Sequence, residues 1–574
     1  MSLMGALHVG NSGLQTSSNA LNTTGHNLSN VGTIGYTRQQ VLQGNRRYNK
    51  IGESYISMQQ VGLGVDYTKV RQVRDVFLDT SYRREAGRAG FYTTSYEASQ
   101  EVFVFLGEME EVQFQDSLQK MQDVAQELKN APADATNQGL FVSKAASFLE
   151  RAEAVYNGLC SYQDNLNGQI KDMVDKINKY GDQIYELNQK IVAIEAGGIE
   201  SANDYRDVRN QLLDELGTMA SISFEENIYG AVLVQVEGRD FVKQSYVNHM
   251  GTTQDAQTGF YNVVWPRDEN NAVFNLQQKV SMEHGTDIGS LKALLLARGD
   301  RRGTYADLPV RPVREDYADD TEYSKALYEY NEAKDIYNRD VAPSLMVNTM
   351  AEFDRLIHDI VTSINEVLNP RTVTNEVKLD DNGNPVLDKD GNPVMVTKVS
   401  GFDLFLRKGV DDVTTEEDPD SPPTLYTVSN LKINPLLLQQ YTYLGATKCE
   451  DGSYTTGFRK PDGSENQEMA DALVALFGKE FAPLNPNNET KYTYMEYYNN
   501  FVGSLGTLGS VYEGMASNEM QAAESIDASR QQLVGVSDSE ELTNMIKFQN
   551  AYNASSRYFN VINEMLAHVI ERLG

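Results

Sequence analysis

The chain has 574 residues, 40% of them hydrophobic, which allows about three or four domains of roughly 150 residues with apolar cores. Its 81 acidic and 50 basic residues give a formal net charge of -31, which argues against nucleic acid or an anionic membrane as a partner. The two cysteines, Cys160 and Cys449, exclude a disulfide scaffold, the six histidines show no metal-ligand spacing, and no apolar run is long enough to span a bilayer.

The first forty residues carry leucines one heptad apart, and no Asp, Glu, Lys or Arg occurs before Arg38. This spacing predicts a helix that packs along a partner helix. Ordering the backbone of some thirty residues costs about 1–2 kcal/mol each. Burying four leucines contributes only roughly 1.5–3 kcal/mol each, which is less than this cost. We therefore expect the helix to need a partner; the alternative is an ordinary buried helix of a globular domain. The predicted seam consists of Leu3, Leu7, Gly10, Leu14, Ser17, Leu21, Thr24 and Leu28.

A block rich in Asn, Ser and Gly follows the heptads, from Asn27 to Gln39. These residue types end helices and form turns, because short polar side chains compete for backbone hydrogen bonds and glycine permits positive φ. The block reads Asn-x-x-Asn-x-x-Thr-x-Gly-Tyr and includes Asn30, Gly35 and Tyr36. It resembles the end of the N-terminal helix in the bacterial flagellar axial proteins, the family of rod, hook and hook-associated subunits.

Further blocks extend this resemblance. Tyr-Thr-Arg-Gln at 36–39 is most similar to the hook-associated members of the family, which form the junction between hook and filament. Residues 62–83 resemble the family's next block. Within them, Gly62-x-Gly64 is no dinucleotide fingerprint, because the third glycine is absent.

A third block, at 203–216, carries the pattern Asp-x-x-Asp-x-Arg-x-x-Leu and also resembles the hook-associated members. Clustered acids can indicate a cation site or an acid/base pair. Here they alternate with arginines at helical spacing, so we interpret them as solvated ion pairs worth a few tenths of a kcal/mol each. The residues concerned are Asp204, Arg206, Asp207, Arg209 and Asp214.

Long helices are predicted on both sides of that block. Residues 95–151 have a helical pattern broken at Ala131-Pro132, since proline disfavours helix in the residue before it. Apolar positions alternate by four and three over 166–194, which predicts a coiled-coil-like helix ended by Gly197-Gly198. The helical pattern returns near 286, resumes at Val341 and stops at 369–370. The charged, tyrosine-rich residues 300–340 match no block of the family and are interpreted as an exposed helical insertion.

In two regions the apolar residues occur at every second position, as they do in β-strands. Residues 221–285 contain alternating valines and several short apolar runs, which predict a small β domain. Residues 371–488 hold a repeat of period eight, with Asn-Gly-Asn-Pro-Val at 382–386 and Asp-Gly-Asn-Pro-Val at 390–394, which predicts hairpins. A calcium loop starting at Asp388 is excluded, because its glycine falls at the fourth position instead of the sixth.

The C-terminal segment mirrors the N-terminal one. Helix is predicted from about Tyr494, and Ser537-Asp538-Ser539-Glu540 is a capping box that opens a last helix. Residues 535–555 resemble the C-terminal block of the axial proteins, with Phe548 in place of the usual tyrosine. The predicted seam of this helix consists of Phe548, Tyr552, Ser555, Phe559, Ile562, Leu566, Val569 and Leu573.

Together these patterns predict a mainly α fold with inserted β domains, in which the two terminal helices form a coiled-coil pair. The predicted domains are 1–60 with 533–574 as a terminal assembly domain, 61–220 with 286–370 and 489–532 as a long helical-bundle body, and 221–285 and 371–488 as two outward β domains.

The resemblance implies a structural flagellar subunit that polymerises with copies of itself. Its implied partners are the hook protein, the adjoining hook-associated junction protein on the filament side, the type III export apparatus and an export chaperone. Because no basic n-region, continuous apolar core or cleavage site occurs, we expect no cleavable signal. The resemblance implies a location in the extracellular flagellum. The predicted assembly residues are Leu3, Leu7, Leu14, Leu21, Leu28, Asn27, Asn30, Gly35, Tyr36, Phe548, Tyr552, Phe559, Ile562, Leu566, Val569 and Leu573.

Two alternatives stay open at this point. One is another axial protein, such as the hook or distal rod subunit. The other is a glycan-binding or enzymatic module on the outer β domains, although the sequence has no His-Glu-x-x-His, Gly-x-Ser-x-Gly or phosphate loop. We therefore expect no catalytic residue, cofactor, metal, nucleic acid or membrane insertion.

Overall fold

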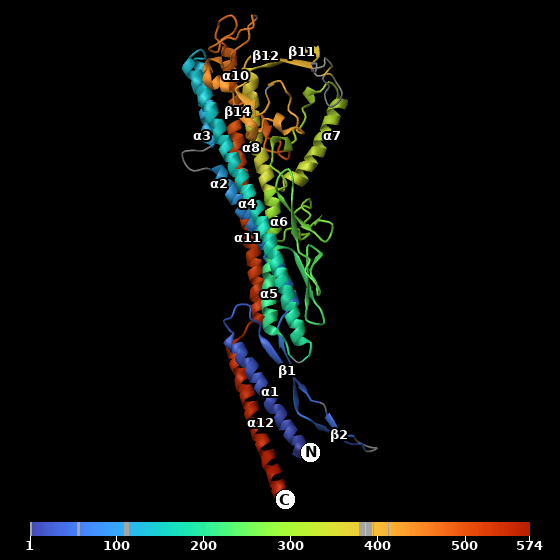
Figure 1. Cartoon of the computed structure of the whole chain (residues 1–574). Helices are drawn as coiled ribbons and strands as arrows, with labels where there is room; N and C mark the ends of the chain where they lie inside the picture. The colour runs from blue at the N-terminus through green and yellow to red at the C-terminus, as the bar shows by residue number, and fades with distance from the viewer. Residues whose placement is uncertain are drawn as a thin grey trace.

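The heptad segment forms helix α1 (Leu3–Ser29), and the C-terminal seam forms helix α12 (Asp538–Leu573). In this computed structural model the two helices lie side by side at one end of an elongated molecule, and the helical body occupies the rest (Figure 1). The structure describes residues 3–46, 48–53, 58–107, 114–198, 200–377, 395–410, 412–449 and 451–573, with the single residues 385 and 393.

Two strand pairs follow α1, where the sequence analysis predicts none. β1 (Gln39–Asn45) pairs antiparallel with β4 (Val65–Gln72), and β2 (Tyr48–Glu53) pairs with β3 (Met58–Gly62). The β1–β4 ladder packs against α1. The sequence of β1, Gln-Gln-Val-Leu-Gln-Gly-Asn, has only two apolar residues, so its period of two is too weak to detect.

The body is a bundle of long helices joined by shorter ones. Helix α11 packs along α2, and α8 contacts both α4 and α11. Helix α3 forms a hairpin with α4, while α5 and α6 pack between α2 and α4. The bounds are α2 Val76–Gly107, α3 Phe114–Asn130, α4 Ala135–Glu195, α5 Asn203–Met219, α6 Ser290–Arg298, α8 Leu345–Leu368 and α11 Tyr494–Val534.

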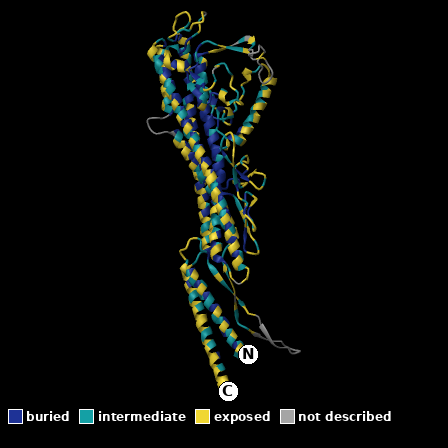
Figure 2. Cartoon of the chain, viewed as in Figure 1, coloured by how far each residue is buried: buried dark blue, intermediate teal, exposed yellow. Residues whose placement is uncertain are grey.

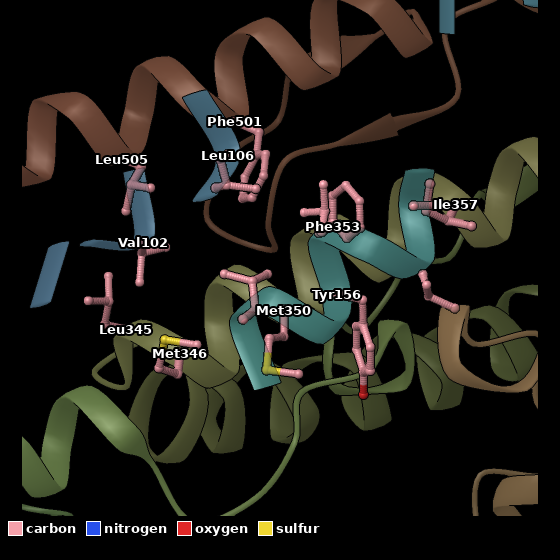
Figure 3. Close-up of a cluster of buried hydrophobic side chains, with 14 of the residues drawn as sticks. Val102, Leu106, Tyr156, Leu345, Met346, Met350, Phe353, Ile357, Phe501 and Leu505 are labelled. Carbon is pink, nitrogen blue, oxygen red and sulfur yellow. The ribbon is translucent and has the colours of Figure 1, made fainter. Parts of the chain in front are cut away.

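The core of the body surrounds α8. Figure 2 shows the densest burial along this part of the molecule, and Figure 3 shows Met350, Phe353 and Ile357 of α8 close to side chains of α2, α4 and α11. The Phe353 ring lies 5.2 Å from that of Phe114, which in turn lies 5.4 Å from that of Phe148. Full burial of each such side chain contributes roughly 1.5–3 kcal/mol, so the body has a large apolar core.

Several helix boundaries confirm the sequence analysis. The predicted break at Ala131-Pro132 separates α3 from α4, and the Asp134 carboxylate caps α4 by accepting the Thr136 N–H at 2.8 Å. The predicted seam at 166–194 lies within α4, which ends at Glu195 before the two glycines. Helix α8 stops at Leu368, before the predicted Asn-Pro stop. The buried seam residues of α4 include Leu166, Ile170, Ile177, Ile184 and Ile191.

The first predicted β domain forms two three-stranded antiparallel sheets. Val232, Val234 and Val236 are buried and the residues between them are exposed, as the sequence pattern predicts. The sheets pack on α4, where a Cβ atom at Gly181 would collide with the Phe241 ring. The strands are β5 Ile222–Glu226, β6 Val232–Val236, β7 Arg239–Val242, β8 Gly251–Gln254, β9 Tyr261–Trp265 and β10 Asn271–Ala272.

The second predicted β region contains only short strand pairs in its described part. It also contains helix α9 (Pro435–Gln439) and helix α10 (Gln467–Gly478), which packs against α3 and α8. The sequence analysis missed α10, whose twelve residues cover little more than three turns. The period-eight repeat lies outside the described residues, apart from Pro385 and Pro393. The strand pairs are β11 Arg371–Val377 with β12 Met395–Val399, β13 Phe405–Arg407 with β14 Leu431–Ile433, and β15 Ala482–Pro483 with β16 Lys491–Tyr492.

The insertion at 300–340 contains short 3-10 turns and helix α7 (Asp320–Ile336), none of whose residues is buried. The interpretation of an exposed helical insertion is confirmed for α7, whereas Tyr305, Leu308 and Tyr337 of the same insertion are buried. Figure 1 shows α7 standing on one flank of the body. Within the described part of the chain, no helix combines the length and the hydrophobicity that crossing a membrane requires.

Candidate assembly site at the chain ends

Small side chains form the contact between α1 and α12. A Cβ atom at Gly10 would approach the Phe559 Cα to 3.4 Å, and one at Gly13 would lie 2.6 Å from Ser555 Oγ. Larger residues at these positions would push the two helices apart. The buried residues of α1 are Ala6, Gly10, Ser12, Thr16, Ser17, Ala20, Thr24 and Asn27.

The leucines of α1 flank this contact instead of forming its centre. Each of the five predicted leucines is half-buried, whereas Ala6, Ala20 and Asn27, each directly preceding one of them, are buried. Neighbouring residues on a helix point about 100° apart, so the leucines border the seam. Their role in contacts between copies stays a prediction. They are Leu3, Leu7, Leu14, Leu21 and Leu28.

Helix α12 buries only part of its predicted seam. Ile562 is buried, Phe548, Phe559 and Leu566 are half-buried, and the side chain of Leu573 lies outside the described residues. Eight large apolar residues of α12 are between 40% and 66% exposed. Tyr558, Val561, Met565 and Val569 follow the three–four spacing of one helix face, and we call them the exposed stripe. An exposed apolar surface of this kind marks a protein-protein contact. The other exposed residues are Leu542, Ile546, Tyr552 and Ile570.

The motif residues after α1 form a hydrogen-bonded turn. Asn27 Nδ2 donates to the Gln39 carbonyl at 2.9 Å, while Asn27 Oδ1 accepts the Gln39 N–H at 3.0 Å and the Tyr36 hydroxyl at 2.8 Å. Asn27 is buried, so losing these partners would leave a costly unsatisfied amide. Asn30 Nδ2 donates to the His26 carbonyl at 2.9 Å and closes the last turn of α1.

We call the surrounding contact region the joint: Asn27, residues 34–39, Gln72, Asp207, Gln211, Glu540 and Glu541. Gly35 has a φ of +80°, which favours glycine, and a Cβ atom there would collide with the Gln211 side chain. Gln211 Nε2 donates to the Ile34 carbonyl at 2.9 Å. The motif glycine thus lets the chain pass close to α5 of the body.

Asp207 holds the joint from the body side. It accepts the Thr37 N–H at 3.1 Å and Gln72 Nε2 at 2.8 Å. Burial raises the pKa of the Asp207 carboxyl to about 6, against the lowering effect of the hydrogen bonds from Thr37. The prediction that Asp207 is a solvated ion pair is therefore wrong, because this carboxylate is buried and bonded to the terminal segment. Among the three aspartates of this block, Asp204 alone is exposed.

Arg38 joins the two chain ends. Its Nη1 lies 2.8 Å from Glu540 and its Nε lies 2.9 Å from Glu541, at the start of α12. Its backbone N–H donates to the carbonyl of Val534, the last residue of α11, at 2.9 Å. The first charged residue of the chain thus binds the acids that begin the last helix.

The arginines of the 203–216 block are also partly buried. Arg209 is 1% exposed and donates to Glu226 at 2.8 Å and to the Gly230 carbonyl at 2.7 Å. Arg206 donates to Glu195 at 2.8 Å and to Glu226 at 2.7 Å. The prediction of solvated pairs is wrong here too, since these contacts join α5 to the end of α4 and to the first sheet.

Asp214 forms a third link and is half-buried. It accepts Arg83 Nε and Arg530 Nη1, both at 2.7 Å. These contacts join α5 to α2 and α11. The sequence showed the acid but not its partners, which lie more than a hundred residues away.

Of the joint residues, only Asn27, Gly35 and Tyr36 were predicted as assembly residues. The missed ones lie inside the motif blocks, so motif membership could have identified them. They are Ile34, Thr37, Arg38, Gln39, Gln72, Asp207, Gln211, Glu540 and Glu541. Among the described residues, no group of three or more His, Cys, Asp or Glu side chains is placed to hold a metal ion.

This geometry defines an elongated structural subunit whose paired terminal helices leave an apolar stripe exposed. Residues 100–372 match the family described as "Flagellar hook-associated protein FlgK helical domain". Flagellar hook-associated protein 1 of Bacillus subtilis (strain 168) is 23% identical, with 97% of this chain and 95% of that protein covered. The protein of the same name from Escherichia coli (strain K12) is 21% identical, with 97% and 98% covered.

A solved structure, the flagellar hook junction protein FlgK from Burkholderia pseudomallei, shares 12% sequence identity with this chain. It covers 80% of this chain and 100% of its own, with a TM-score of 0.47. The chain is thus similar to flagellar hook-associated protein 1 along nearly its whole length, and its residues 100–372 match the helical-domain family.

Proposed function

We propose that this chain is a structural subunit of the bacterial flagellum that forms the junction between hook and filament. The exposed apolar stripe of α12 carries the proposal, because a helix pair with such a stripe needs further partners. The match to hook-associated protein 1 over 97% of the chain favours this role over that of a hook or distal rod subunit.

In this proposal the terminal pairs of many copies form the inner wall of a tubular layer, and the sheets and α7 face outward. The half-buried leucines of α1 and the stripe of α12 contact neighbouring copies. The hook protein lies on one side of the layer, and the adjoining hook-associated junction protein on the other.

Export follows from the weakness of the terminal pair. Segments that fold only against neighbours can pass unfolded through the type III export apparatus and become ordered at the growing tip. An export chaperone would cover α12 before assembly, since its apolar stripe would otherwise aggregate. The chain then acts in the extracellular flagellum as a structural subunit.

Replacing Leu14 and Leu21 by Asp tests this function. We expect the body to stay folded, judged by circular dichroism and denaturant unfolding, while the chain disappears from isolated flagella. The control is Leu438→Asp, at an exposed leucine of α9 in the second predicted β region, and this variant should be incorporated normally. Normal incorporation of the α1 variant would contradict the proposal.

A further inference from the structure

A groove of about 390 Å³ lies between α7 and the segment at 481–491. Leu308, Leu327 and Tyr330 line one side of it, and Phe481 and Leu484 line the other. Cavities of this volume commonly receive a few side chains of a ligand. The groove belongs to the insertion at 300–340, which has no role in the terminal assembly site.

The groove is basic although the chain is strongly acidic. Arg311, Lys334, Arg355 and Lys491 line it, against the single acid Glu489. Arg355 pairs with Asp359 of its own helix, and Arg311 forms only an exposed pair with Glu489 at 3.3 Å. Within the described residues Lys334 and Lys491 form no ion pair. Two lysines therefore remain to bind an acidic partner.

The same insertion carries an acidic segment just before and at the start of α7. Glu315, Asp316 and Glu322 are exposed and form no ion pair within the described part of the chain. Asp319 caps α7, and Arg314 Nε donates to Asp320 at 2.7 Å, so these two acids already have partners. Tyr317 lies between these acids and supplies an aromatic ring.

We propose that the groove of one copy binds the acidic segment 315–322 of a neighbouring copy. The acids would pair with Lys334 and Lys491, and Tyr317 would enter the apolar part of the groove. The segment leads into α7 and the groove is lined by residues of the same helix, so both belong to the same insertion. Such different patches, contacting head to tail, can close a ring of copies. The proposal rests on the proposed function.

Charge reversal tests the contact in the full-length chain. Lys334→Glu with Lys491→Glu should remove the contact, and adding Asp316→Lys with Glu322→Lys should restore it. Lys325→Glu with Lys398→Glu, two exposed lysines outside the groove, is the matched control. A zero-length carbodiimide, which joins amines to carboxylates, is applied to isolated flagella and to the monomeric protein, and cross-linked peptides are identified by mass spectrometry.

We expect cross-links between the groove lysines and residues 315–322 in flagella carrying the unaltered chain and none in the monomer. They should be lost in the double reversal, kept in the control and regained in the fourfold variant. If the chain is present in flagella but no such cross-link forms, the inference is overturned and the proposed function stands. Failure of the fourfold variant to regain the cross-links would also overturn it. Absence of the unaltered chain from flagella would instead contradict the proposed function.

Discussion

The helical body and the terminal pair use different residues to pack helices. In the body, fully buried aromatic and long aliphatic side chains such as Phe114, Phe148 and Phe353 fill the space between helices. In α1 every buried residue is Ala, Gly, Ser, Thr or Asn, and in α12 the buried large apolar residue is Ile562.

This difference shows which part is self-sufficient. Apolar burial stabilises in proportion to the area removed from water, so the body holds itself together and the terminal pair gains little from its internal contact. Apart from Ile562, the larger apolar residues of the pair are left half-buried or exposed. They are available to neighbouring copies.

The largest expected contrast is in hydrogen exchange of the monomer. Amides of α4 and α8 should exchange at a rate set by global unfolding, which costs about 5–15 kcal/mol. Amides of α1 and α12 should exchange about a thousandfold faster or more, because local opening of the pair is cheap. Equal protection of both regions, measured at concentrations where the chain is monomeric, would contradict the claim that the terminal pair is less stable than the body.

A core substitution should destabilise the body and leave the pair's role untouched. Phe353→Ala should lower the free energy of unfolding by about 3–5 kcal/mol, because the cavity cannot be filled by its packed neighbours. Met565→Ala on the exposed stripe of α12 should change it by about 0.5 kcal/mol at most. Denaturant unfolding followed by circular dichroism measures both, and similar losses would show that the pair belongs to the same cooperative unit.

Adding a single methyl group at Gly35 should destabilise the joint. Gly35→Ala should cost about 1–2 kcal/mol for the left-handed backbone and add a collision with Gln211. We expect faster proteolysis at residues 30–40 with an unchanged unfolding of the body. Gln211→Ala should relieve part of the effect, while Gly32→Ala, where a Cβ atom meets nothing within 4 Å, is the control and should behave as the unaltered chain.

The smallest expected effect is a pH dependence of the joint. Burial raises the pKa of Asp207 from 3.8 to about 6, so its contribution is complete below pH 4 and is lost as the pH rises through 6. Peptides covering residues 30–40 should therefore exchange faster at pH 7.5 than at pH 5, after correction for the intrinsic rate. Asp207→Asn should flatten this dependence, and an unchanged slope in that variant would assign it to another group.

Much of the fold could be predicted from the periodicity of apolar residues and from residues that end helices. The seam within α4, the break at Pro132 and the alternating valines of β6 are local patterns, and the structure contains each of them. The β1–β4 ladder and α10 were missed, because one has few apolar residues and the other is short. The candidate site was predicted through its motifs, but its register on α1 was not.

The sequence alone determined where the longest helices lie, that both chain ends carry seam patterns and the N-terminal one lacks early charges, and which family the end motifs resemble. These are properties of neighbouring residues, set by backbone preferences and helical period. Only the tertiary structure decided which stripe of α1 meets α12, and that Asp207 is a buried link and Asp214 a half-buried one instead of solvated pairs. Burial and partner choice depend on residues hundreds of positions apart, so no local pattern contains them.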